Sequence, residues 1–155
     1  MAPTTIMQAK RVECDQHEVE ALVRGYRGRL IRTTADGILA IFDAPGQAIR
    51  CAAVVRERAA AVGIGIRAGI HTGEVDLAGE DIAGLSVQIT DRVAALARPA
   101  EILVSRTVKD LVAGTGITFA ERGSYLLDGE TDEWPLFAVT GSAGRSETAV
   151  SARQR

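Results

Sequence analysis

The chain has 155 residues, a net charge of −2, an apolar fraction of 46% and a charged fraction of 25%, which is typical of one globular domain. This balance has no basic excess, so we expect no nucleic acid partner. No apolar run approaches ~18 residues and no signal peptide is recognisable, so we expect no membrane span. Cys14 and Cys51 lie in unrelated surroundings and are expected to be free thiols, as in a cytoplasmic protein.

The first half of the chain predicts a helix, a hairpin and a second helix. Apolar residues at helical spacing define the helices, and Asp36-Gly37 tolerates the positive φ angles of a tight hairpin turn. The predicted elements are a weakly patterned segment (1–15) with at most a short strand at 4–7, a helix (16–27), two strands (29–34 and 38–42) and a helix that begins at Pro45.

The second half predicts alternating strands and helices. Ile64, Ile66, Ala68 and Ile70 share one face of a strand, and Pro99 follows the end of a helix. The predicted elements are a strand (64–70), an exposed connection (72–76), a helix (82–97), a strand (102–104), a short helix (107–113) and two late strands (117–127 and 136–139). The tail 141–155 lacks aromatic residues and is expected to be disordered.

These elements predict an α+β sandwich. With the helices packed on one face, the order gives a ferredoxin-like βαββαβ core with extra C-terminal strands. We expect one domain over residues 16–140, preceded by the weakly patterned segment 1–15 and followed by the tail 141–155.

Four segments, in this order and spacing, carry a resemblance to a known family. They are Arg32–Phe42, Ile66–Val75, Asp81–Arg92 and Glu101–Ser105. Together they resemble the catalytic domain of class III nucleotidyl cyclases, the adenylate and guanylate cyclase family, in a degenerate bacterial form. The resemblance extends from about Glu18 to Val139. It implies the nucleotide cyclase fold, ATP as substrate, and Mg²⁺ or Mn²⁺ as cofactor.

The metal ligands implied by the resemblance are two aspartates. Asp36 matches the aspartate of the hairpin, although an Asp-Gly turn needs no such role. Lys10 falls where the family has its first aspartate, and a lysine there would repel a metal or replace its charge. Glu13 or Asp15 could approach the site instead, but nothing in the spacing requires it.

Catalytic roles are implied for two residues of the 82–97 helix. Gln88 and Arg92 are four residues apart and therefore share a helix face. The family has an asparagine at the first position, which orients the ribose, and an arginine at the second, which stabilises the transition state. Gln88 is one methylene longer than asparagine. Arg92 is alternatively an ordinary surface arginine paired with a carboxylate one turn away.

Recognition of the adenine base is implied for Arg32 and Asp81. The family has a lysine and an aspartate there, and arginine presents a wider planar fork than lysine. Asp81 also fits the N-cap of the following helix. Asp128 occupies the position of a phosphate-binding lysine, which inverts that charge. We interpret His71 as a structural residue near the dimer interface.

Two functions remain open from the sequence. One is an adenylate cyclase that forms cyclic AMP and pyrophosphate by attack of the ribose 3′-hydroxyl on the α-phosphate, with activity weakened or lost. The other is an inactive pseudo-cyclase that binds nucleotide or serves as a dimerisation or regulatory partner; a decayed remnant without ligand is a third reading. The family's sites form between two chains, so the resemblance implies a head-to-tail homodimer or pairing with a complete cyclase.

Overall fold

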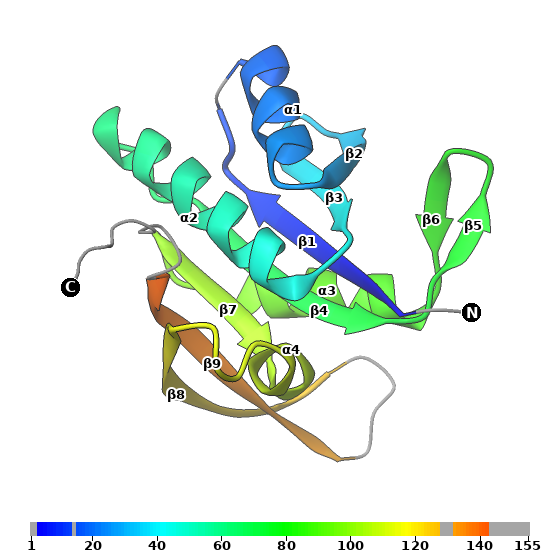
Figure 1. The fold of residues 1–155 in the computed structure, drawn as a ribbon, viewed down its shortest axis with the longest axis vertical. Coiled ribbons are helices and arrows are strands. Elements are labelled where there is room, and N and C mark those ends of the chain that lie inside the picture. Colours follow the sequence, from blue (N-terminus) through cyan, green and yellow to red (C-terminus); the bar gives the residue numbers. More distant parts are fainter. Residues whose placement is uncertain (1–2, 14, 128–131, 143–155) are drawn as a thin grey trace.

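A seven-stranded mixed sheet with helices on both faces forms the body of the protein (Figure 1). The structure is a computed structural model and describes residues 3–13, 15–127 and 132–142. Its elements are β1 (Thr4–Lys10), α1 (Gln16–Gly25), β2 (Gly28–Thr33), β3 (Gly37–Phe42), α2 (Pro45–Ala61), β4 (Arg67–Gly73), β5 (Asp76–Ala78), β6 (Asp81–Ala83), α3 (Leu85–Leu96), β7 (Glu101–Ser105), α4 (Arg106–Leu111), β8 (Ile117–Leu126) and β9 (Glu133–Ser142).

The strand order confirms the predicted α+β core. The main sheet runs β2-β3-β1-β4-β7-β9-β8, and β5 pairs only with β6. The elements β1-α1-β2-β3-α2-β4 form the ferredoxin-like βαββαβ unit, and the C-terminal strands extend the sheet beyond β4. β1 lies antiparallel to both β3 and β4, whereas β4 and β7 are parallel.

The weakly patterned N-terminal segment contains a central strand of the sheet. β1 has seven residues, more than the short strand expected at 4–7, and its Ile6 and Met7 are fully buried on opposite faces. A strand covered on both faces loses the polar–apolar alternation of a half-exposed strand. This is the reason that the sequence pattern was weak there.

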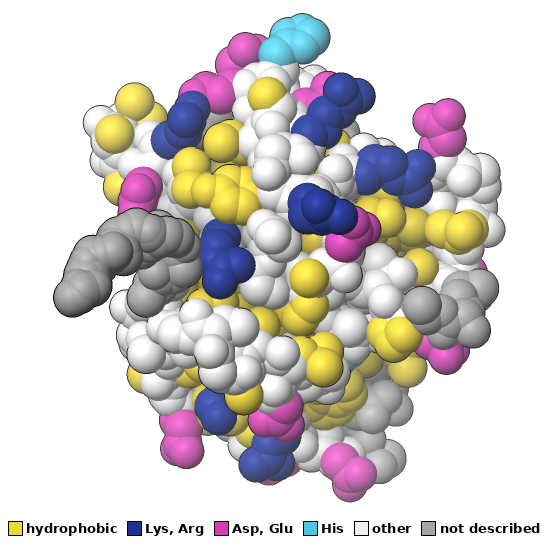
Figure 2. Space-filling model, in the orientation of Figure 1, with side chains coloured by type: hydrophobic (Ala, Val, Ile, Leu, Met, Phe, Trp, Pro, Cys, Tyr) yellow, Lys and Arg dark blue, Asp and Glu magenta, His cyan; other side chains and the backbone are white. Residues whose placement is uncertain are grey.

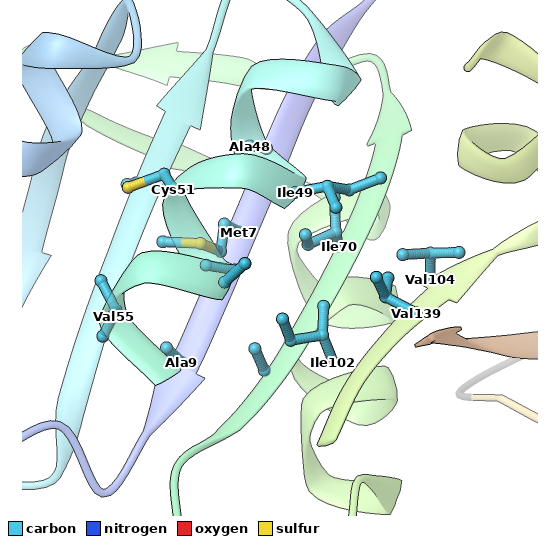
Figure 3. Packing of buried hydrophobic residues seen from close by; sticks show 14 of the residues in the cluster. Met7, Ala9, Ala48, Ile49, Cys51, Val55, Ile70, Ile102, Val104 and Val139 are labelled. Atoms are coloured by element: carbon cyan, nitrogen blue, oxygen red, sulfur yellow. The ribbon is translucent and has the colours of Figure 1, made fainter. Parts of the chain in front are cut away.

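The larger core lies between the sheet and helices α1, α2 and α4. Figure 3 shows Ile49 of α2 beside Ile70 of β4, with Ile102 and Val104 continuing the layer on β7. The small alanines of α2 let that helix lie close to the strands. Cys51 is a buried free thiol in this layer, as expected, and burial raises its pKa to about 12. Cys14 lies outside the described residues.

The expectation that all helices pack on one face was wrong for α3. Figure 1 shows α3 behind the sheet, on the face opposite to α1 and α2. A Cβ atom at Gly69 of β4 would collide with the backbone nitrogen of Ala94, so the glycine permits a close approach of α3. Ile89 and Val93 of α3 pack there against Leu103 and Leu136.

The surface of the α1, α2 and α4 face carries charges of both signs. Figure 2 shows basic and acidic side chains interspersed over this face rather than gathered into one field. No helix in the described part of the chain is long and apolar enough to cross a membrane. Gly141 and Ser142, placed by sequence in the disordered tail, still belong to β9; the rest of that predicted tail lies outside the described residues.

Candidate functional site

The turn between β2 and β3 presents Asp36 to solvent. The Thr34 hydroxyl accepts hydrogen bonds from the N–H groups of Asp36 (3.2 Å) and Gly37 (3.0 Å), and the Thr34 N–H donates to the Gly37 carbonyl (2.9 Å). A Cβ atom at position 37 would collide with the Ala9 carbonyl oxygen, so only glycine lets β3 approach β1 here. The turn that carries the Asp36 carboxylate is therefore fixed by its own hydrogen bonds and by close packing against β1.

Lys10 lies beside this turn. It is the last residue of β1 and is the register partner of Gly37. The N–H groups of Arg11 (2.6 Å) and Val12 (3.3 Å) both donate to the Asp36 carbonyl oxygen, which pins the chain after β1 to the turn. The Lys10 ammonium forms an ion pair with Asp91 of α3, with 2.9 Å between Nζ and Oδ1. The side chains are 28% and 48% exposed, so solvent reaches the pair.

Arg32 and Asp81 form a second ion pair. Arg32 Nη1 lies 3.5 Å from Asp81 Oδ2, with both side chains about half exposed. The two residues that the resemblance assigns to one role therefore lie close together in the fold. Asp81 Oδ1 also accepts a hydrogen bond from the Ile82 N–H (2.8 Å).

The expected helix start at Asp81 was wrong. Asp81 begins β6 of a small hairpin, and α3 starts only at Leu85, after Gly84 with a φ of 118°. Gly79, with a φ of 67°, turns the chain between β5 and β6. Ile82 packs against Ile6 and Leu39 of the main sheet. This tertiary contact fits a strand of a hairpin rather than the first turn of a helix.

Gln88 and Arg92 lie on the exposed side of α3. Asp91 precedes Arg92 and lies three residues after Gln88, so it shares a helix face with Gln88. Val87, one turn before Asp91, packs against the buried Ile6 cluster. The side of α3 that carries Val87 and Asp91 therefore faces β1 and β3 of its own chain.

His71 is buried behind this region. Its Nδ1 lies 2.7 Å from the Ser105 Oγ, and its ring meets the Trp134 ring edge-on at 5.3 Å between centroids. Burial lowers the pKa of His71 to about 4, so the imidazole is neutral at physiological pH. These contacts support the structural interpretation of this residue.

A groove of about 750 Å³ lies elsewhere, at the other end of β3. Arg27, Arg29, Ile41 and Asp43 are among its lining residues. None of the candidate site residues lines it, so this groove is separate from the Asp36 turn and from the residues around it.

Comparison with known proteins agrees with the resemblance in sequence. The chain is 31% identical over 116 residues to a protein of Rhizobium meliloti (strain 1021) named "Putative adenylate cyclase 3". Its fold is similar to a solved adenylate/guanylate cyclase/hydrolase from Silicibacter pomeroyi (TM-score 0.77, 22% identity, 90% of this chain and 96% of that one). It is also similar to the adenylyl cyclase CyaB from P. aeruginosa (TM-score 0.74, 17% identity, 90% and 94%). The chain belongs to the adenylate/guanylate cyclase family.

The cyclase domain matches only part of its curated relative. The aligned residues make up 69% of this chain but 20% of the relative, so the chain spans about a fifth of that protein. No protein-family model matches the sequence.

The residues around Asp36 do not fit the pair of metal ions that the resemblance implies. The described residues of the cyclase domain contain no group of three or more His, Cys, Asp or Glu side chains that could hold a metal. Of the two carboxylates that the sequence offered instead, Glu13 lies 3.7 Å from Arg11 and Asp15 precedes α1. Lys10, on the strand beside the Asp36 turn, directs its ammonium group to Asp91.

Sequence reasoning missed Asp91. Its carboxylate lies on the same helix as Gln88 and Arg92, but no local pattern links it to Lys10, which is 81 residues away. The helical spacing from Val87 was the available signal, because it places Asp91 toward the sheet. Asp128, the expected charge inversion, lies outside the described residues.

Proposed function

We propose that this cyclase-family domain binds ATP and that its conversion of ATP to cyclic AMP is weak or lost. The observation that carries the proposal is the Lys10–Asp91 ion pair beside the Asp36 turn. It supports a site in which an ammonium group stands where the family resemblance implies a second carboxylate. Any cyclisation would then depend on one carboxylate as metal ligand instead of two.

In this proposal Arg32 and Asp81 bind the adenine base. Their ion pair is half exposed, and such pairs contribute only about 0–1 kcal/mol, so exchange of partners with the base costs little. A carboxylate accepts a hydrogen bond from the exocyclic amine, and the guanidinium donates to ring nitrogens. The pair thus holds a donor and an acceptor close together, as recognition of adenine requires.

Gln88 and Arg92 would act on the sugar and phosphates bound by a partner chain. Their exposed position on α3 is compatible with a head-to-tail homodimer, or with a complete cyclase that supplies the metal ligands. Arg92 would stabilise charge on the α-phosphate, and Gln88 would orient the ribose. Removing one preorganised donor from such a site costs about 100- to 1,000-fold in rate, and a misplacement of about 1 Å costs ~100-fold.

The test is cyclic AMP formation from ATP with excess Mn²⁺, compared among the unmodified chain, Asp36→Ala and Arg92→Ala, with ATP binding measured in parallel. If the unmodified chain binds ATP and forms cyclic AMP that both substitutions abolish, the domain is a weak cyclase. If it binds ATP but forms no more cyclic AMP than the two variants, the domain is a pseudo-cyclase. Turnover near the ordinary enzyme value of about 10 s⁻¹, or no ATP binding under any condition, contradicts the proposal.

A further inference from the structure

Two cationic residues stand side by side next to the Asp36 turn. Lys10 of β1 and Arg67 of β4 are direct register partners in the antiparallel ladder. Side chains opposite each other in such a ladder share a face, with Cβ atoms about 4.5–5.5 Å apart, and like charges there destabilise the pairing. Since Lys10 reaches α3, both residues lie on the α3 face of the sheet.

Of these two cations, only Lys10 forms an ion pair among the described residues, with Asp91, while the Asp36 carboxylate stands on the neighbouring turn. In the part of the chain that the structure describes, no carboxylate forms an ion pair with Arg67. Its register partner on β7, Glu101, is held by Arg122 (2.7 Å between Nε and Oε2) and by the N–H of Arg98 (2.7 Å).

We propose that Lys10 and Arg67 form a phosphate-binding corner, at which this domain binds the triphosphate of ATP without a divalent cation. The proposal rests on the proposed function, because it assumes that the domain binds ATP. It deepens that function by assigning the neutralisation of phosphate charge to the protein's own cations. A phosphate between the two side chains would relieve their mutual repulsion.

The Lys10–Asp91 ion pair can open at low cost. An ion pair with side chains 28% and 48% exposed contributes little to stability, because water screens it. A triphosphate carries several negative charges, and hydrogen bonds between an ammonium and a phosphate oxygen are about twice as strong as neutral ones. Lys10 can therefore exchange the Asp91 carboxylate for a phosphate oxygen while its backbone stays pinned to the turn.

The experiment measures ATP binding by the full chain in excess EDTA and in Mn²⁺, with inorganic triphosphate as a competitor. We expect a Kd in EDTA within about threefold of the value in Mn²⁺, and competition by inorganic triphosphate without metal. Lys10→Met and Arg67→Met should each weaken binding in EDTA by about tenfold or more, as for loss of a charged hydrogen-bond partner. Lys10→Arg should retain most of the binding.

The matched control is Arg24→Met, which removes one positive charge from a side chain that is 76% exposed on α1, on the opposite face of the sheet. It should bind like the unmodified chain. An unchanged thermal transition in Lys10→Met confirms that the variant is folded. If Lys10→Met loses no affinity in EDTA, or if Arg24→Met loses as much, the inference is wrong.

Failure of this inference is distinguishable from failure of the proposed function. Binding that appears only with Mn²⁺ overturns the metal-free corner but leaves ATP binding intact. Absence of binding both in EDTA and in Mn²⁺ overturns both. A complementary variant, Lys10→Asp, should convert metal-free binding into binding that requires Mn²⁺, since it places a second carboxylate next to Asp36.

Discussion

The two faces of the main sheet are built differently. The face beneath α1, α2 and α4 holds one continuous apolar cluster that extends across the sheet from β3 to β8. The opposite face has two small clusters, one under α3 and one under the β5–β6 hairpin. The ion pairs Lys10–Asp91 and Arg32–Asp81 join the sheet to these two elements.

This difference separates the main source of stability from the candidate site. Burial of apolar surface is the main favourable term in folding, so most of the fold's stability is expected from the α1/α2/α4 face. Partly exposed ion pairs contribute little, so the residues of the Lys10–Asp91 and Arg32–Asp81 pairs can change without loss of the fold. A cyclase domain can thus carry Lys10 next to Asp36 and keep the architecture of the family.

The largest expected effect comes from a cavity on the apolar face. Ile49 of α2 is fully buried, so Ile49→Ala should lower the free energy of unfolding by about 2–5 kcal/mol. Urea denaturation measures this value. Val62→Ala is the control, since Val62 is 71% exposed and its change should stay within about 0.5 kcal/mol. Equal losses in the two variants would contradict the assignment of stability to the buried apolar cluster.

A smaller, pH-dependent effect is expected from His71 on the other face. Its pKa is about 4 in the folded chain against 6.5 as the ordinary value, so between these limits the unfolded chain binds more protons. The contribution of His71 to the free energy of unfolding is therefore fully present above pH 6.5. It decreases as the pH drops toward 4, by at most about 3 kcal/mol. Denaturant melts at several pH values test this, with His71→Gln as the comparison.

The His71→Gln variant should lose that part of the pH dependence while the carboxylates still titrate. His17→Gln is the matched control, because His17 is exposed on α1. A His71→Gln profile parallel to that of the unmodified chain between pH 6.5 and 4 would show that this histidine does not contribute.

Arg122 should have an intermediate effect. Its guanidinium bonds both carboxylate oxygens of Glu101 (2.7 and 3.1 Å), the Leu96 carbonyl (3.0 Å) and the Tyr125 hydroxyl (2.8 Å). Since both charged side chains are 14% exposed, Arg122→Ala should cost about 2 kcal/mol by stranding Glu101. Thermal melts give the value, and recovery in Arg122→Ala/Glu101→Gln would assign the cost to the stranded carboxylate.

The smallest effect on stability is expected at Lys10. Because the ion pair with Asp91 is partly exposed, Lys10→Met should change the free energy of unfolding by less than about 1 kcal/mol. The same variant is expected to lose ATP affinity. Lys10→Met should therefore weaken binding with little change in stability, whereas the main effect of Ile49→Ala should be on stability. A large loss of stability in Lys10→Met would place this ion pair among the groups that hold the fold.

Strong local patterns were sufficient for most of the fold. The Asp-Gly turn and the Pro45 helix start predicted β2, β3 and α2 closely, because turn and capping preferences depend on a few adjacent residues. The apolar stripe of α3 and the late strands were also predicted, with boundaries shifted by a few residues. β1 was underestimated, because a strand buried on both faces carries no alternation.

The candidate site was predictable to a lesser degree. The pairing of Arg32 with Asp81 and the position of Lys10 beside Asp36 agree with the family resemblance. The roles of Asp36, Gln88, Arg92, Arg32 and Asp81 remain predictions. The secondary structure around Asp81 was wrong, because the packing of Ile82 on the sheet accompanies a strand where the sequence favoured a helix.

Residues close together in the chain were enough to indicate most of the turns and helices and the motifs of the cyclase family, because those features arise from local backbone preferences and short motifs. The link between Lys10 and Asp91 and the adjacency of Lys10 and Arg67 arise between residues 81 and 57 positions apart. The face occupied by α3 is likewise set by contacts between separate elements of the chain. Such contacts depend on strand register and on the close approach of α3 to Gly69, which no local pattern encodes. The charge balance of the site is for this reason a property of the folded chain.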